Sequence, residues 1–162
     1  MTAYDVTEWS DFFVGSAGAS AALAGLVFVA VSINIERILE TEGIPDFAMV
    51  ALLMLIGVLL VSLLCLIPGQ ETEALGWEMI IGGILWGLLA GTRLLQSIPK
   101  GDQHYLLSRV AMPIGGTLPL VVGAITLIVG SGGGLYWIAA GVVMTIFAAV
   151  VNAWIVLVEI LR

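Results

Sequence analysis

Five apolar stretches, each long enough to cross a lipid bilayer, constrain the fold of this chain more than any other feature. A transmembrane helix needs about 20 mainly apolar residues to cross roughly 30 Å of hydrocarbon. The stretches that meet this requirement are Phe12–Ile35, Phe47–Ile67, Leu75–Leu95, Met112–Val129 and Leu135–Leu161. Because the connections between them are short, we expect an all-α integral membrane protein. The predicted fold is a five-transmembrane-helix bundle that forms a single membrane domain over residues 1–162.

The positions of the basic residues predict how this bundle is oriented. Arg37 follows the first stretch, Arg93, Lys100 and Arg109 frame the third connection, and Arg162 ends the chain. The N-terminal tail and the second and fourth connections contain no lysine or arginine. Cytoplasmic loops of membrane proteins carry an excess of these residues. We therefore expect the N-terminus outside and the C-terminus inside, as in a multi-pass protein of the bacterial cytoplasmic (inner) membrane.

The acidic charge balance of the chain argues against nucleic acid as a partner and favours cations. The chain is 60% hydrophobic and 10% charged, with a formal net charge of −7, so no basic surface is available for nucleic acid. Half of the acidic residues fall on the predicted outer side, where no basic residue accompanies them: Asp5, Glu8, Asp11, Glu71, Glu73 and Glu78. Such a surface raises the local concentration of cations. The alternative is that these acids only keep short outer segments solvated.

The first apolar stretch is rich in small residues. Small side chains let helix backbones approach closely, and this packing drives helix association in lipid. The residues predicted to form a helix-packing surface or an oligomer interface are Gly15, Gly18, Ala19, Ala22 and Gly25. Because small residues point in several directions, we expect protein on most sides of this helix. It is predicted to lie either at the centre of the bundle or at a contact between subunits.

The fourth stretch contains the most irregular backbone that the sequence predicts. An interfacial helix over Asp102–Ala111 leads into it, and Pro119 then removes an N–H that would bond the carbonyl of Gly115, beside Gly116. We expect a broken fourth helix, with Gly115, Gly116, Thr117 and Pro119 on an ion pathway, because broken helices often form such sites. Two alternatives are a packing kink satisfied by Thr117 or a neighbouring helix, and a re-entrant segment that places the C-terminus outside.

Two further polar residues are candidates for the same pathway. Asn152 lies deep in the fifth stretch, where its short side chain reaches neither surface. Polar groups at such depth need a partner or water, and the alternative is a hydrogen bond between helices. Glu78 lies near the outer headgroups, where it either attracts cations or is simply solvated.

The residues needed for catalysis or metal binding are few. The chain has one histidine (His104), one cysteine (Cys65) and one lysine (Lys100). No cluster has metal-ligand spacing, and no Gly-x-Ser-x-Gly motif presents a serine nucleophile. We expect no enzyme activity, no cofactor and no metal.

These observations favour a homo-oligomeric, channel-like protein for cation permeation. A single chain of this size has little room for a central path, whereas pores are built from rings of carbonyls or carboxylates. Glu78 would attract cations, and Gly115, Gly116 and Thr117 would line the constriction. The alternative is a non-transporting accessory, scaffold or regulatory subunit of a larger membrane complex. The expected partners are the lipid bilayer, further copies of the chain, or another membrane protein.

Overall fold

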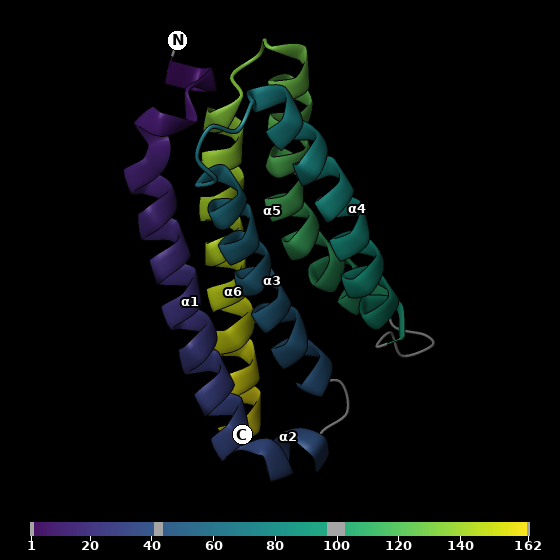
Figure 1. Ribbon diagram of the computed structural model, residues 1–162. Coiled ribbons are helices and arrows are strands. Elements are labelled where there is room, and N and C mark those ends of the chain that lie inside the picture. The colour runs from purple at the N-terminus through teal and green to yellow at the C-terminus, as the bar shows by residue number, and fades with distance from the viewer. Residues whose placement is uncertain (1, 41–43, 97–102, 162) are drawn as a thin grey trace.

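The computed structural model describes residues 2–40, 44–96 and 103–161, and the side-chain surroundings of residues 3–40, 44–88 and 115–158. The described chain is helical, without strands, and its five long helices run up and down in one bundle (Figure 1). These helices are α1 (Ser10–Ile33), α3 (Ile44–Cys65), α4 (Thr72–Gln96), α5 (Gln103–Val129) and α6 (Leu135–Leu161). The short elements are η1 (Thr2–Tyr4), η2 (Val6–Trp9) and α2 (Ile35–Glu40).

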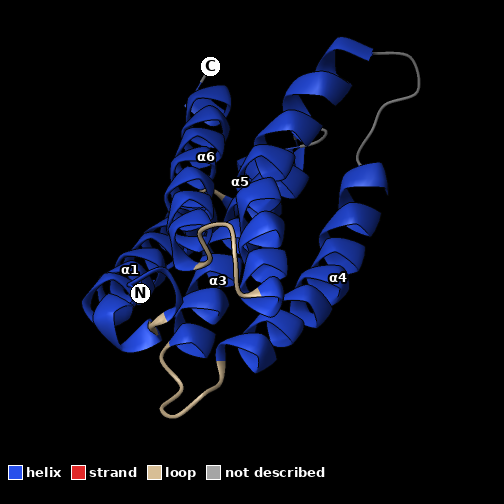
Figure 2. Cartoon of the chain, turned by 90° about the horizontal axis from the view of Figure 1, so that it is seen from above, coloured by secondary structure: helices blue, strands red, loops and turns tan. Residues whose placement is uncertain are grey.

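The two helices α3 and α6 form the middle of the bundle (Figure 2). On one side α1 packs mainly against α3; on the other, α5 packs against α6 and α4 packs against α5. The helices α1 and α4 therefore lie on opposite flanks. The N- and C-termini lie at opposite ends of the bundle (Figure 1). We call the end that holds the N-terminus the outer end and the end that holds α2 the inner end.

The all-helical prediction is confirmed, and three of the described helices are long and apolar enough to cross a membrane. Their apolar segments are Val6–Ile33, Ile44–Cys65 and Leu135–Val158. The described side chains of α5 form a shorter apolar segment, Gly115–Val129. The predictions that rest on Arg93, Lys100, His104, Arg109 and Arg162 concern residues outside the described side chains.

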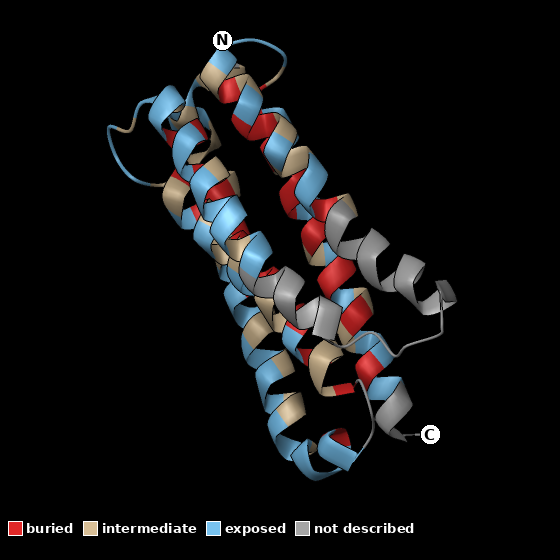
Figure 3. Cartoon of the chain, turned by 90° about the vertical axis from the view of Figure 1, so that its right-hand side faces the viewer, coloured by how far each residue is buried: buried red, intermediate tan, exposed pale blue. Residues whose placement is uncertain are grey.

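Buried residues lie on the inward sides of the helices, and exposed residues follow their outer sides (Figure 3). The largest buried cluster fills the outer half of the bundle, with Phe13 of α1, Val58 of α3, Leu75 of α4 and Leu127 of α5 among its members. Smaller clusters follow toward the inner end. Since lipid tails are as apolar as these side chains, close packing and not escape from water holds such helices together.

The first predicted stretch does not stay helical to its end. The helix α1 stops at Ile33, and Asn34 has non-helical backbone angles of φ −108° and ψ 19°. The Asn34 side chain donates a hydrogen bond to the carbonyl of Ala30, 2.9 Å away. Asparagine competes in this way with the helical ladder. The chain therefore turns at Asn34 into α2, a helix that hydropathy did not predict.

The prediction of a broken fourth helix is wrong, because α5 is helical without interruption across Pro113 and Pro119. Residues 103–111, predicted as a separate interfacial helix, are the first turns of α5. Proline removes one N–H and crowds the carbonyl four residues earlier, which for Pro119 belongs to Gly115. Helices in membranes tolerate this loss, since neighbouring helices and small backbone adjustments re-satisfy the freed groups.

Candidate functional site

Gly116, predicted to line a constriction, lies instead in a closed contact between α5 and α6. A Cβ atom placed on Gly116 would overlap Oγ1 of Thr145. It would also lie only 3.0 Å from Cα and 3.1 Å from Cβ of Thr145. Gly116 and Thr145 are both buried. Because the two backbones approach so closely, this position has no room for a passing ion.

Two further glycines repeat this contact along the same pair of helices. A Cβ on Gly123 would lie 2.6 Å from Cγ1 of Ile138, and a Cβ on Gly141 would lie 2.6 Å from Cγ of Leu120. We call Gly116, Gly123 and Gly141 the α5–α6 glycine seam. Glycines at an interface let two helices pack backbone to backbone, which is the main source of helix association in lipid. The seam is therefore a structural feature that fixes α5 against α6.

The other residues of the predicted constriction face elsewhere. Gly115 is half-buried, and a Cβ on it would meet no atom within 4 Å. Thr117 is exposed on α5, and Pro119 is half-buried. The structure thus separates Gly116, which faces α6, from Thr117, which faces outward. These residues do not converge within a single chain.

Asn152 forms a hydrogen bond to a neighbouring helix, which was the alternative to a place on the ion pathway. Its side chain is 8% exposed, and its Nδ2 donates to the carbonyl oxygen of Phe47 at 3.3 Å. The bond joins α6 to α3 near the inner end. Hydrogen bonds of this kind contribute about 0.6–2 kcal/mol in membranes. Asn152 therefore has a structural role that needs no ligand.

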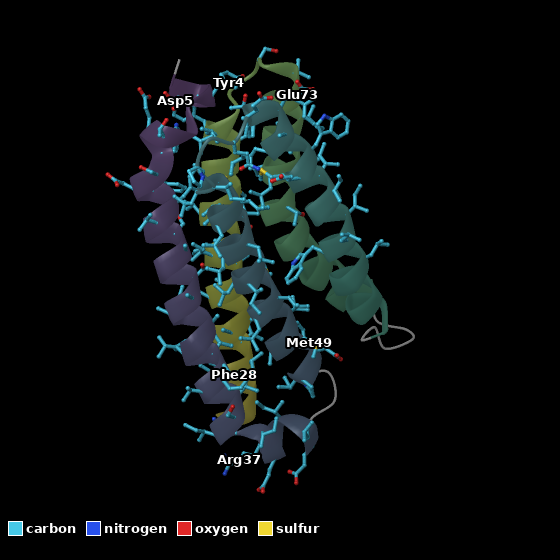
Figure 4. The ribbon with its side chains drawn as sticks, viewed as in Figure 1. Tyr4, Asp5, Phe28, Arg37, Met49 and Glu73 are labelled. Carbon is cyan, nitrogen blue, oxygen red and sulfur yellow. The ribbon has the colours of Figure 1, made fainter. Side chains whose placement is uncertain are left out.

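Glu78 lies on the exposed side of α4, two turns from the outer end of that helix. Its carboxylate accepts a hydrogen bond from Nε2 of Gln70, which precedes α4. The outer-end acids Asp5, Glu8, Asp11, Glu71, Glu73 and Glu78 are all exposed. Figure 4 shows Asp5 and Glu73 at this end and Arg37 at the opposite one. Six carboxylates from two segments of the chain, residues 5–11 and 71–78, thus gather toward one end of the bundle.

Asp5 is the outer-end acid whose ionised form is most clearly stabilised. The Thr7 hydroxyl and the Thr7 backbone N–H both donate to Oδ1 of Asp5, the latter at 3.1 Å. These hydrogen bonds, the hydroxyl first, lower the pKa of Asp5 below its ordinary value of 3.8. The side chain also caps η2. Asp5 is therefore a fixed negative charge at neutral pH.

A clamp at the outer end escaped prediction from sequence. The phenol oxygen of Tyr4 accepts a hydrogen bond from the backbone N–H of Gly133 at 3.0 Å. Gly132 and Gly133 have φ of +98° and +111°, in the region that favours glycine. Trp9 packs edge-on against Tyr136, with ring centroids 4.8 Å apart. These two contacts tie the N-terminal segment to the α5–α6 connection and to the first turn of α6.

The small residues of α1 share one face, which points away from the bundle. Gly15, Gly18, Ala19, Ala22 and Gly25 are all exposed, and a Cβ on any of the three glycines would meet no atom within 4 Å. They cover about a third of the helix circumference. Phe13, Ser16 and Ser20 form the buried side instead. The prediction that α1 is the centre of the bundle is therefore wrong; its role as a subunit contact stays a prediction.

Comparison of the chain with protein-family profiles, with curated proteins and with solved structures finds no match. Among the described residues, no group of three or more histidine, cysteine, aspartate or glutamate side chains is placed to hold a metal ion. The described chain is therefore all-helical, with three helices long and apolar enough to span a membrane, and its exposed candidate features are the outer-end acids, Thr117 and the outward face of α1.

Proposed function

We propose that the chain is a five-span protein of the bacterial inner membrane, with the N-terminus outside and the C-terminus inside. The up-and-down order of five long helices supports an odd number of crossings, as do termini at opposite ends of the bundle (Figure 1). A helix rises 1.5 Å per residue, so α4 and α5, with 25 and 27 residues, measure roughly 38 and 40 Å. Each is long enough for a bilayer core of about 30 Å.

We infer that several copies of this chain form a cation-permeation path between subunits, and that the protein is not an enzyme. The observation that carries this proposal is the charge of the outer end. Six exposed carboxylates gather there, and the sequence places no lysine or arginine in the segments that form it. Such a surface concentrates cations and repels anions.

The path is proposed between subunits because the interior of one chain is tightly packed where a path was expected. The α5–α6 glycine seam closes the contact at Gly116, and Asn152 is engaged by the carbonyl of Phe47. Of the candidate pathway residues, Glu78 and Thr117 keep this role, since both are exposed, and Gly115 adjoins Thr117. Gly116 packs against Thr145 and Asn152 bonds to the Phe47 carbonyl, so neither residue is proposed as part of the path.

Ion flux from liposomes that contain the purified protein tests this function. We expect potassium and sodium, but not chloride, to pass under an imposed voltage. Glu78→Gln should lower cation flux several-fold if Glu78 lies at the mouth, whereas the matched neutralisation Glu8→Gln should lower it less. Equal loss in both variants would mean a general field effect without a localised mouth. A folded, monodisperse preparation that passes no ions would refute permeation.

A second function is favoured by a specific observation, the exposed faces of both flanking helices. On α1 and α4, residues such as Gly18, Gly25, Gly82 and Gly87 leave open space beside the backbone. Small residues of this kind suit close contact with another membrane helix. A non-transporting accessory or scaffold subunit would use them to bind a larger complex. Purified protein that stays monomeric and passes no ions would favour this function over a homo-oligomeric channel.

A further inference from the structure

Two hydroxyl groups are buried among the described helices without a hydrogen-bond partner there: Oγ of Ser62 on α3 and Oγ1 of Thr145 on α6. Ser62 is 0% exposed and Thr145 is 6% exposed. Hydroxyls on helices often donate to a carbonyl of the preceding turn. Ser20, Ser32 and Thr126 do so in this protein. Because a buried polar group without a partner is costly, the two exceptions need a physical explanation.

Thr145 lies next to a carbonyl that has lost its usual donor. Pro119 has no N–H, so it cannot bond the carbonyl oxygen of Gly115, four residues earlier in α5. That carbonyl belongs to the planar peptide group that joins Gly115 to Gly116. A Cβ on Gly116 would overlap Oγ1 of Thr145, so the hydroxyl lies against the same peptide group. A buried hydroxyl without an acceptor and a carbonyl without its helical donor are thus neighbours across the α5–α6 contact.

The outer half of α5 is fixed on two sides, and Pro119 lies near the middle of this helix. Gly123 packs closely against Ile138 of α6, and Gly76 of α4 packs closely against Ala124. Helices bend most often at a proline, because one hydrogen bond is missing and the carbonyl of the preceding turn is crowded. A bend at Pro119 would therefore leave the outer half of α5 in place and move its inner half relative to α6.

We propose that α5 is a hinged helix with two conformations and that the Thr145 hydroxyl stabilises the bent one. In the conformation described above, Gly116 packs against Thr145 and the hydroxyl has no partner. In the bent conformation, the Gly115 carbonyl turns out of the helix and accepts a hydrogen bond from Oγ1 of Thr145. This bond offsets the packing that is lost, which keeps the two conformations close in free energy. The hinge requires only that α5 and α6 pack as described, and it is independent of ion passage.

A double-mutant cycle tests whether the hydroxyl and the freed carbonyl interact. Thr145→Val removes the hydroxyl at nearly constant volume, and Pro119→Ala restores the N–H that bonds the Gly115 carbonyl. Unfolding of the purified protein by sodium dodecyl sulfate in mixed micelles gives the unfolding equilibrium constant of each variant. We expect Thr145→Val to raise this constant about three- to tenfold when Pro119 is present and to leave it unchanged in the Pro119→Ala background. Equal effects in both backgrounds would overturn the proposal, since a hydroxyl that only packs, or bonds its own helix, does not depend on residue 119.

Hydrogen exchange measured by mass spectrometry tests the bending itself, and its wild-type result stands even if a variant does not fold. We expect the amides of residues 115–120 to exchange several-fold faster than those of residues 123–128, because bending opens the turn around Pro119. Thr145→Val should slow this exchange, and Thr145→Ser, which keeps the hydroxyl, should not. The matched control Ser62→Ala removes a buried hydroxyl from a different helix and should leave exchange in α5 unchanged. Uniform exchange along α5 in the wild type, or faster exchange in Thr145→Val, would refute the hinge.

Discussion

Alanine at Gly116 should destabilise the protein, whereas alanine at the preceding residue, Gly115, should not. A Cβ on Gly116 would overlap the Thr145 hydroxyl and lie 3.0 Å from Thr145 Cα, whereas a Cβ on Gly115 meets nothing within 4 Å. The hydroxyl can rotate away, but the Cα atom moves only with the backbone of α6. The two helices must therefore separate by a few tenths of an ångström. Overpacking of this kind costs about 1–3 kcal/mol.

Comparison of the two variants isolates this packing effect. Both replace glycine by alanine in one helix, so the gain in helix propensity, about 0.5–1 kcal/mol, is common to both. The difference in the free energy of unfolding between them is therefore the overpacking at Thr145, about 1–3 kcal/mol. It can be measured by titrating mixed micelles with sodium dodecyl sulfate and following the fluorescence of the five tryptophans. A difference below about 0.5 kcal/mol would show that α5 and α6 are not in backbone contact at Gly116.

Three further outcomes follow from the described contacts. Asn152→Ala should lower the free energy of unfolding in the same titration by about 0.6–2 kcal/mol, because it removes the bond to the Phe47 carbonyl. Gly18→Leu, on the outward face of α1, should not lower that free energy, because a Cβ there meets no atom within 4 Å and helix propensity rises by about 0.5–1 kcal/mol, but it should weaken any oligomer seen by cross-linking. Asp5 has a lowered pKa when folded, so its stabilising contribution is present above pH 4 and is lost as the pH falls through that pKa. Thermal unfolding of Asp5→Asn should therefore lack the part of the stability loss below pH 4 that the wild type shows.

Helix positions were predictable from sequence because a bilayer demands long, uninterrupted apolar segments. The stretches expected at Phe47–Ile67 and Leu75–Leu95 correspond to α3 at Ile44–Cys65 and α4 at Thr72–Gln96. Every backbone N–H and C=O in the hydrocarbon must be bonded within the helix, so length and hydropathy largely determine the element. The same argument fails for short segments outside the apolar stretches. The helix α2 was missed for this reason, and so was the packing of Tyr4 on the α5–α6 connection.

Which face of each helix is buried could not be read from the sequence. The helix α1 is apolar around almost its whole circumference, so no periodic pattern marks its inward side. In water, polar residues would mark the outward face, but in lipid both faces are apolar. Gly18 and Gly116 look alike in sequence, yet one is exposed on α1 and the other is closed against Thr145. Only the position of the neighbouring helix distinguishes them.

Within one chain, nothing in the described structure compensates for the helix stability that the exposed glycines of the flanking helices α1 and α4 cost. Glycine weakens a helix by about 0.5–1 kcal/mol relative to alanine, and close packing is the usual compensation in lipid. The α5–α6 glycine seam obtains that compensation, as does Gly76, whose Cβ would lie 2.8 Å from the carbonyl oxygen of Ala124. Gly18 on α1 and Gly83 and Gly87 on α4 do not, since nothing described lies within 4 Å of a Cβ on them. Contact with a helix from another chain would supply the missing compensation, and this is the physical argument for association on both flanks of the bundle.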